Sequence, residues 1–406
     1  MATNRIFTSL AQKSLVILLI YLLWLSQGLY RSNTLTYVFT ILSAIFVILD
    51  MLQTGKLLLV KHNIVHFYFV FLLYSLISGI IIAQEKDYFL QQIGTLLSYC
   101  VVCYDIYYVS KKQHTIKWIE IPVVSSAILS AVQLLLIPHI HRGGQISLGE
   151  TNNPNDLGVL MLFGIFLLVY RRKGIEKLFI AKVICIIILL YGIILTGSRQ
   201  ALLAAFFFIL FWLISYIRKG NYAKNKRKEL FSLAILAVAS FIVLNYINKY
   251  FSETVAFSRL LELLTAKGTS QRRALYKRGL EVWKKHLFFG VGYAQFLFYN
   301  SYNLPSHSTY IEALSGGGII GFLLVLIPVL ALGKDIVKSN IFWKKSTKAY
   351  EKQILLLMFL TELFLGVEKE WFYSFNHLLI WICISWEVAE DVRPHSRRKS
   401  GFITES

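Results

Sequence analysis

The chain has 406 residues, of which 56% are hydrophobic and only 16% are charged, and its mean hydropathy is +0.59. Soluble domains are typically about 45–50% apolar and about 25% charged. This composition excludes a soluble enzyme, a disordered chain and a disulfide-rich secreted module as the main architecture. The long apolar runs predict an all-α integral membrane protein with many transmembrane helices.

Twelve apolar runs are candidate membrane spans, and because some are shorter than the roughly 20 residues of a full span, we expect local thinning of the bilayer there. They lie near residues 15–30, 34–52, 64–83, 90–109, 118–137, 156–170, 178–196, 200–217, 230–247, 308–333, 353–367 and 372–388. We expect transmembrane helices 1–9 within 1–247, a helical extracytoplasmic loop at 248–307, transmembrane helices 10–12 within 308–388 and a basic cytoplasmic tail at 389–406. The first run lacks a small-residue cleavage site, so we expect no cleavable signal.

The 42 Lys and Arg outnumber the 22 Asp and Glu, which gives a formal net charge of +20. Such an excess is typical of nucleic-acid-binding proteins, but in a membrane protein basic residues gather in cytoplasmic loops. With the N-terminus inside, the inner segments contain 27 Lys and Arg, and the five short outer loops contain one each. The segment 248–307 carries nine, but long loops largely escape this rule. We therefore expect both termini in the cytoplasm and no nucleic-acid partner.

The sequence favours neither a metal nor a cofactor. It has no D-x-D pair to hold a metal-bound nucleotide-sugar, no phosphate-binding glycine loop and no serine elbow. His139 and His141 form a lone H-x-H pair, and Cys100 and Cys103 form a C-x-x-C without further ligands nearby. The cysteines all lie in apolar runs, so we expect them to be buried side chains.

The long outer segment has helical periodicity in two places. Residues 253–266 fit a helix that lies on the membrane surface, and residues 271–287 fit a second helix. On the second helix Arg272 falls on the apolar arc with Tyr276, whereas Arg278 falls on the polar arc and should face solvent. Arg272 either extends along an apolar surface or points into an enclosed anion site, and the helical pattern leaves both open.

His307 stands where this segment re-enters the membrane, directly before the next helix. Thr309 and Glu312 have the T-x-x-E spacing of a capping box, so we interpret Glu312 as a helix cap in preference to a catalytic acid. A neutral histidine can accept a proton from a hydroxyl group near neutral pH. His307 is therefore a candidate general base.

Three arginines share the expected outer interface with His307. Arg142 and Arg199 stand in short outer loops, and Arg272 is on the inward arc of its helix. Arginine forks match phosphate oxygens in bidentate geometry and stay charged when partly desolvated. Together with the histidine they indicate transfer from a phosphate-bearing leaving group to an alcohol at the outer membrane face.

Five motifs, in this order, resemble the O-antigen ligase and Wzy-type O-antigen polymerase family. They are NPNDLG at 153–158, LTGSRQALLA at 195–204, SQR before LYKRGL at 270–280, GVGY at 290–293, and HSTYIE at 307–312 running into GIIG at 318–321. The match covers roughly residues 150–325 by motif, and the remaining spans match by topology alone.

Members of that family are membrane glycosyltransferases with a C-type fold, and they use sugars linked to undecaprenyl diphosphate without a metal. The resemblance implies that His307 activates the acceptor hydroxyl. It implies that Arg199 and Arg272, together with Arg142, bind the diphosphate. Glu312 and Tyr276 would support the site. Attack would invert the anomeric carbon and release undecaprenyl diphosphate.

The shared motifs do not separate a polymerase from a ligase. A polymerase moves the chain onto another lipid-linked repeat unit, and a ligase moves it onto lipid A core. We favour a polymerase of O-antigen, capsular or exopolysaccharide units in the bacterial cytoplasmic membrane, with a chain-length regulator and a flippase as partners.

A polysaccharide transporter or flippase is the alternative from another class, since twelve spans with both ends inside also suit it. Many transporters show internal repeats and ionisable residues in mid-membrane. Here no repeat is evident, and a structural scaffold would need neither an inward Arg272 nor the isolated Arg199.

Overall fold

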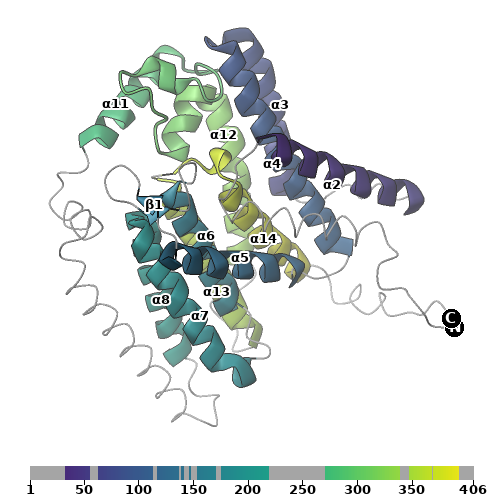
Figure 1. The fold of residues 1–406 in the computed structure, drawn as a ribbon. Helices are drawn as coiled ribbons and strands as arrows, with labels where there is room; N and C mark the ends of the chain where they lie inside the picture. The colour runs from purple at the N-terminus through teal and green to yellow at the C-terminus, as the bar shows by residue number, and fades with distance from the viewer. Residues whose placement is uncertain are drawn as a thin grey trace.

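The computed structural model shows a bundle of helices (Figure 1). It describes residues 33–54, 63–112, 117–136, 139–140, 146–147, 153–170, 175–218, 270–338, 347–367 and 369–392. Two of the twelve expected spans, 15–30 and 230–247, lie outside these residues, as does the expected surface helix 253–266. The other ten spans all fall on helices.

Ten described helices correspond to expected spans. They are α2 (Asn33–Thr54), α3 (Asn63–Ile82), α4 (Lys86–Lys112), α5 (Lys117–Leu136), α6 (Pro154–Tyr170), α7 (Ile175–Thr196), α8 (Arg199–Arg218), α12 (Thr309–Lys338), α13 (Thr347–Leu365) and α14 (Phe375–Val392). Helix α11 (Ser270–Lys285) is the second helix expected in the long segment, and its existence is confirmed. Short 3-10 helices follow at η3 (Phe296–Tyr299) and η4 (Trp371–Tyr373).

One short ladder departs from the all-α expectation. Strands β1 (His139–Ile140) and β2 (Ile146–Ser147) pair antiparallel between α5 and α6. The loop that joins these two helices doubles back on itself, and its backbone groups pair across the hairpin. Arg142 belongs to the link between the strands and lies outside the described residues.

Helix α6 forms the centre of the bundle and packs against α5, α7 and α8 (Figure 1). Most of its residues are buried, because it is apolar on every side. Small side chains allow the close approach: a Cβ at Gly164 would lie 2.9 Å from the Cβ of Ala127, and one at Gly192 would lie 2.6 Å from the sulfur of Met161.

Two described helices are long and apolar enough to cross a membrane, Lys86–Tyr108 within α4 and Thr309–Lys338, and six shorter helices are also apolar. Large apolar side chains are exposed along several helices, including Ile41 on α2 and Ile81 on α3. Such wide apolar exposure fits a membrane protein. The number of twelve spans stays a prediction.

Helix α12 is not one continuous span, because it breaks at Gly318, where φ is 61° and ψ is −163°. The backbone groups freed by the break bond to the segment 287–292. The four hydrogen bonds run from Val291 N–H to Ser315 C=O (2.9 Å), Gly292 N–H to Gly316 C=O (2.8 Å), Ile319 N–H to Leu287 C=O (2.8 Å) and Ile320 N–H to Phe288 C=O (3.3 Å). These four bonds give partners to backbone groups on both sides of the break, which an apolar environment would otherwise leave unpaired at a high free-energy cost.

Glycine is required on both sides of this contact. A Cβ at Gly290 would lie 2.5 Å from the backbone of Gly316, and one at Gly318 would lie 2.3 Å from the backbone of Phe288. Both glycines also have φ in the left-handed region. The G-x-G at 290–292 and the glycines at 316–318 therefore join α12 to the segment that follows α11.

Candidate functional site

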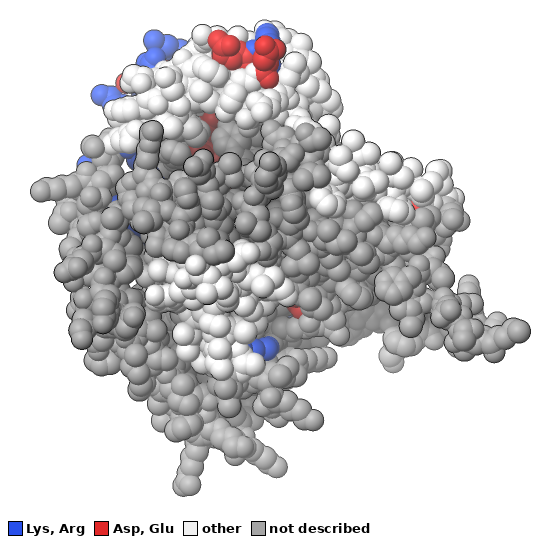
Figure 2. Space-filling model, viewed as in Figure 1, with Lys and Arg blue, Asp and Glu red and all other residues white. Residues whose placement is uncertain are grey.

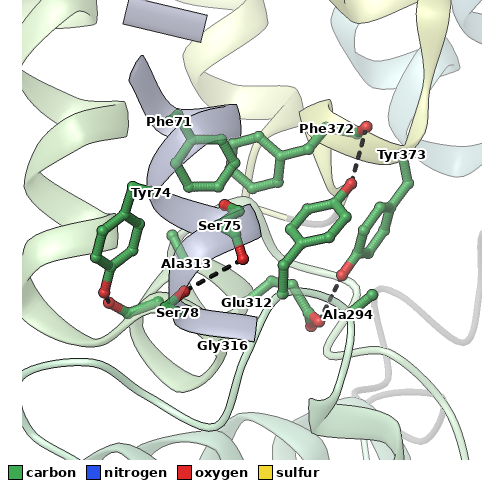
Figure 3. A pocket seen from close by; sticks show the side chains of 12 residues that line it. Phe71, Tyr74, Ser75, Ser78, Ala294, Glu312, Ala313, Gly316, Phe372 and Tyr373 are labelled. Carbon is green, nitrogen blue, oxygen red and sulfur yellow. Dashed lines mark hydrogen bonds between the residues drawn. The ribbon is translucent and has the colours of Figure 1, made fainter. Parts of the chain in front are cut away.

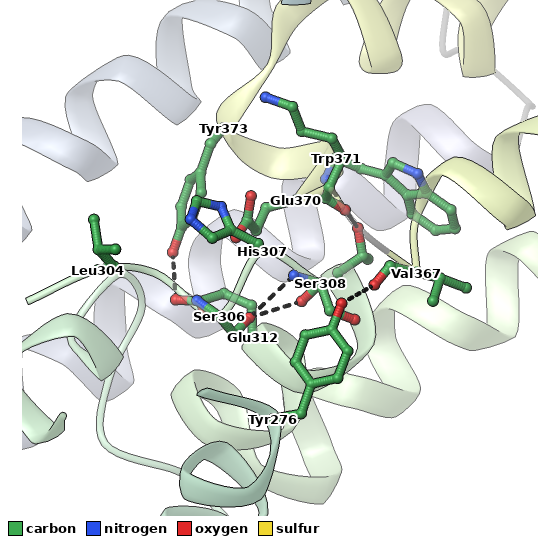
Figure 4. A network of polar contacts seen from close by, with 12 residues as sticks. Tyr276, Leu304, Ser306, His307, Ser308, Glu312, Val367, Glu370, Trp371 and Tyr373 are labelled. Carbon is green, nitrogen blue, oxygen red and sulfur yellow. Dashed lines mark hydrogen bonds and ion pairs between the residues drawn. The ribbon is translucent and has the colours of Figure 1, made fainter. Parts of the chain in front are cut away.

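His307 projects from a tight turn directly before α12 (Figure 4). The hydroxyl of Ser306 donates to the carbonyl of Ser308 (3.0 Å) and accepts from its N–H (3.2 Å). Both serines are buried, whereas the His307 side chain is 36% exposed. The backbone of His307 has φ 57°, which is uncommon for a residue other than glycine and marks a constrained position typical of functional sites.

The loop between α13 and α14 holds this turn in place. The N–H of Thr309 donates to the carbonyls of Gly366 (2.9 Å) and Lys369 (3.1 Å). The hydroxyl of Thr309 donates to the Lys369 carbonyl (2.6 Å) and accepts from the N–H of Trp371 (2.9 Å). Gly366 and residues 369–371 are thereby fixed beside His307.

The expected capping box is not formed. The Thr309 hydroxyl is engaged by the loop after α13, so it does not bond the N–H of Glu312. The Glu312 carboxylate accepts instead from the N–H of Ser306 (2.9 Å) and from the hydroxyl of Tyr373 (2.8 Å). Glu312 still caps backbone ahead of its helix, but it also ties the His307 turn to η4.

Glu370 faces His307 from this loop. Its Oε1 lies 3.7 Å from His307 Nδ1, and the carboxylate is 5% exposed. Among the described residues Oε1 has no hydrogen-bond partner. Burial raises the pKa of Glu370, while the neighbouring Lys369 opposes that rise. The carboxylate is placed to stabilise a positive charge on the imidazole once one forms.

Burial, as the largest cause, and the positive charges of Arg272 and Lys369 together lower the pKa of His307 to about 4. A histidine with this pKa is neutral at neutral pH, so it can accept a proton. Arg272 is therefore close enough to His307 for its positive charge to act on the imidazole.

Lys369 connects this group to the start of α6. Its Nζ lies 2.7 Å from Asp156 Oδ1, and the two side chains are 11% and 17% exposed. Asn153 and Pro154 begin α6: the Asn153 side chain accepts from the N–H of Asn155 (2.9 Å), and Pro154 has no N–H to leave unpaired. The NPND motif thus orients Asp156 toward Lys369.

Arg199 is the first residue of α8 and is half-buried. A positive charge at this helix end opposes the helix dipole, and a bound anion would offset that cost. The turn before it uses Gly197 at φ 63°. A Cβ at Gly158 of α6 would lie 2.9 Å from Ser198, so the starts of α8 and α6 touch. Arg199 therefore stands at the end of the bundle that carries Asp156.

Helix α11 is held against the same loop. The Tyr276 hydroxyl donates to the carbonyl of Val367 (2.7 Å), and a Cβ at Gly279 would lie 2.3 Å from Ile311. Tyr276 thus supports the position of the helix that carries Arg272. Arg278 is exposed, as expected, and bonds the Tyr299 carbonyl (2.7 Å).

A hollow between α3 and α12 adjoins the His307 turn (Figure 3). Glu312 and Tyr373 line it and also flank the turn, and Ser75 and Ser78 face it from α3. The hydroxyl of Tyr74 donates to the Gly317 carbonyl in its wall (2.5 Å). Aromatic rings, hydroxyl groups and a carboxylate therefore line this hollow beside the candidate base.

In the part of the chain that the structure describes, no three His, Cys, Asp or Glu side chains are grouped so as to hold a metal ion. Cys100, Cys103 and Cys383 are buried and Cys185 is partly buried, and all four are free thiols. Among the charged groups around His307, Arg272 and Lys369 are positive, and Glu370 and the Asp156 partner of Lys369 are acidic.

Two residues of the site were not assigned a role from the sequence. Lys369 counted only as one of five isolated cations in short outer loops, and Glu370 was not singled out. The sequence feature that could have pointed to them is a Lys-Glu pair in a short link between two apolar runs. Its importance becomes visible only when that link is seen to lie beside His307.

The model of a family described as O-antigen ligase matches residues 184–326. The match includes Arg199, Arg272 and His307 and confirms the resemblance seen in the motifs. A chain of a solved structure described as "Structural coordination of polymerization and crosslinking by a peptidoglycan synthase complex" aligns with 82% of this chain and 100% of its own length, at 13% identity and a TM-score of 0.44. A likeness of this size assigns neither fold nor activity. No curated protein matches at a significant level.

Proposed function

Because residues 184–326 match the O-antigen ligase family, we propose that this protein transfers a glycan from a lipid-linked diphosphate to an acceptor hydroxyl. One observation carries the proposal. His307 is partly exposed, and the positive charges of Arg272 and Lys369 help to keep its imidazole neutral. The buried Glu370 carboxylate lies 3.7 Å from His307 Nδ1. That arrangement joins a base to an anion site, as glycosyl transfer from a diphosphate requires.

In the proposed reaction His307 takes the proton of the acceptor hydroxyl as its oxygen attacks the anomeric carbon. The bond from that carbon to the diphosphate oxygen breaks, and the leaving diphosphate keeps the electron pair. Arg272 and Arg199, with Arg142, would bind the diphosphate and stabilise the charge that grows on it. Glu370 would stabilise the imidazolium that forms on His307.

The finer assignment is a polymerase that uses undecaprenyl-diphosphate-linked repeat units as both donor and acceptor, with inversion at the anomeric carbon and without a metal. In that role it would lie in the bacterial cytoplasmic membrane, with both termini inside, and work with a flippase and a chain-length regulator. The excess of basic residues in the expected inner loops supports this orientation. A ligase that transfers to lipid A core would use the same residues.

The test is to give purified protein lipid-linked repeat units alone, and then with lipid A core. Lengthening of the units supports the polymerase, and transfer only to the core supports the ligase. His307→Ala should abolish either product while the protein still inserts into membranes. Products of wild-type length from that variant would remove His307 from the mechanism, and lipid movement without any new glycosidic bond would favour the transporter.

A further inference from the structure

The end of α11 and the residues after it expose apolar and basic side chains together. Leu287, Phe288 and Phe289 are 47%, 65% and 56% exposed, and one exposed residue, His286, separates them from the exposed Lys284 and Lys285. Figure 2 shows Lys and Arg side chains along the edge of the molecule where Figure 1 draws α11. Single exposed apolar residues need no explanation, but three in a row beside two cations indicate an interaction surface.

The exposure is fixed by the backbone. The carbonyls of Leu287 and Phe288 accept from the N–H groups of Ile319 and Ile320, and no side chain larger than hydrogen fits at Gly318. These bonds hold the segment against the break in α12. Its apolar side chains therefore stay on the surface.

The break in α12 places this segment at the start of a membrane-length helix. The 20 residues from Ile319 to Lys338 measure about 30 Å at about 1.5 Å per residue, which equals the hydrocarbon thickness of a bilayer. Leu323, Ile327 and Leu330 are exposed along it at helical spacing. Leu287–Phe289 thus stand at the level where this apolar stripe begins.

We propose that Leu287–Phe289 is an interfacial anchor that enters the outer leaflet, while Lys284 and Lys285 bind the phosphates of anionic lipids. Aromatic side chains favour the boundary between headgroups and acyl chains, and lysines extend from it toward phosphate. The two cations make an anionic lipid surface the complementary partner. The proposal does not depend on glycosyl transfer, and only the choice of the outer leaflet rests on the orientation proposed above. It ties one end of α11 to the bilayer while Arg272 projects from the other.

The depth of the segment can be measured with a spin label on the full-length protein in lipid nanodiscs, in a background without the native cysteines. The label is placed at Phe288→Cys and, as a control on the same outer segment, at Tyr302→Cys, since Tyr302 is 45% exposed. Collisions with oxygen should dominate at position 288, and collisions with a water-soluble nickel complex at position 302. Equal access of the nickel complex to both positions would overturn the anchor.

A label at position 288 that is shielded from both reagents in native membranes would also overturn it, because a protein partner would then cover the segment.

The headgroup contact is tested by phosphatidylglycerol enrichment around the protein in mixed nanodiscs with phosphatidylcholine. Lys284→Gln with Lys285→Gln should reduce the enrichment by roughly fivefold for each lysine. Arg273→Gln with Lys277→Gln removes the same charge from exposed positions nearer the start of α11 and should have little effect. Equal losses in both pairs, or none, would refute binding at the end of α11.

Discussion

Lys369 Nζ lies 2.7 Å from Asp156 Oδ1, so the loop after α13 is joined to the first turn of α6 by a largely buried ion pair. The two residues are far apart in the chain, yet the pair sets the position of the loop that carries Glu370. It also places a positive charge close enough to His307 to lower its pKa. The pair therefore connects the core of the bundle to the candidate base.

Removing one partner of this pair should disturb the site more than removing a surface charge. Asp156→Asn leaves the Lys369 ammonium buried without its counter-ion, which is strongly unfavourable. We expect at least a tenfold loss of transferase activity, measured on lipid-linked repeat units. Lys338→Gln serves as the control, since it removes an exposed cation from the last turn of α12, at the opposite end of that helix from His307. Activity of Asp156→Asn equal to that of the control would show that the pair does not position the site.

The acid limb of the activity profile should reflect His307. Because the neutral imidazole is the active form and its pKa is about 4, activity should fall only as pH drops toward about 4. Arg272→Gln removes a charge that lowers this pKa, so the midpoint should move to higher pH. Burial is the larger cause and remains, so the midpoint should stay below the ordinary value of 6.5. Initial rates measured across pH give this midpoint, with the stability of each variant checked in parallel. An unchanged midpoint would show that Arg272 does not affect the pKa of His307.

Glu370→Gln should lower kcat by about 10²-fold with little change in KM, because the carboxylate acts on the imidazolium that forms during proton transfer. Glu281→Gln is the matched control: this carboxylate is exposed on α11 and pairs with Arg278. Steady-state kinetics of both variants give the kcat and KM values that test this prediction. A Glu370→Gln enzyme with unchanged kcat would leave Glu370 with a structural role alone.

Arg199→Lys and Arg272→Lys should each lose most activity, since a point charge replaces a bidentate fork. Arg278→Ala should be mild, because Arg278 is exposed and contacts a carbonyl and Glu281. Turnover and donor KM are the quantities to measure. Near-normal turnover in both lysine variants would exclude the diphosphate clamp, and a complete loss in Arg278→Ala would show that the polar face of α11 has a function.

The contact between α12 and the segment 287–292 predicts a sharp difference between neighbouring glycines. Gly318→Ala would place a methyl group 2.3 Å from the Phe288 backbone at positive φ, whereas Gly317→Ala would meet only the ring of Tyr74 at 3.6 Å. We expect Gly318→Ala to lower the thermal midpoint and the activity, and Gly317→Ala to change neither substantially. Equal behaviour of the two variants would mean that the break in α12 is not needed.

Ten of the twelve expected spans and the helix of Arg272 could be predicted because apolar runs and helical periodicity are local properties of the sequence. The side of α11 that carries Arg272 followed from the same periodicity. The capping box was wrong because Thr309 bonds the Lys369 carbonyl, which belongs to a loop sixty residues away. The hairpin at β1 and β2 was missed because two-residue strands leave no periodic signal.

By itself the sequence determined the helical membrane class, the order of the motifs and the residue types suited to a base and an anion site. The tertiary structure decided which of them meet. It brought Glu370 and Lys369 to His307, broke α12 at Gly318 and linked α6 to the loop after α13. The reason is that these contacts join segments distant in the chain. Their geometry depends on how whole helices pack, which no local pattern encodes.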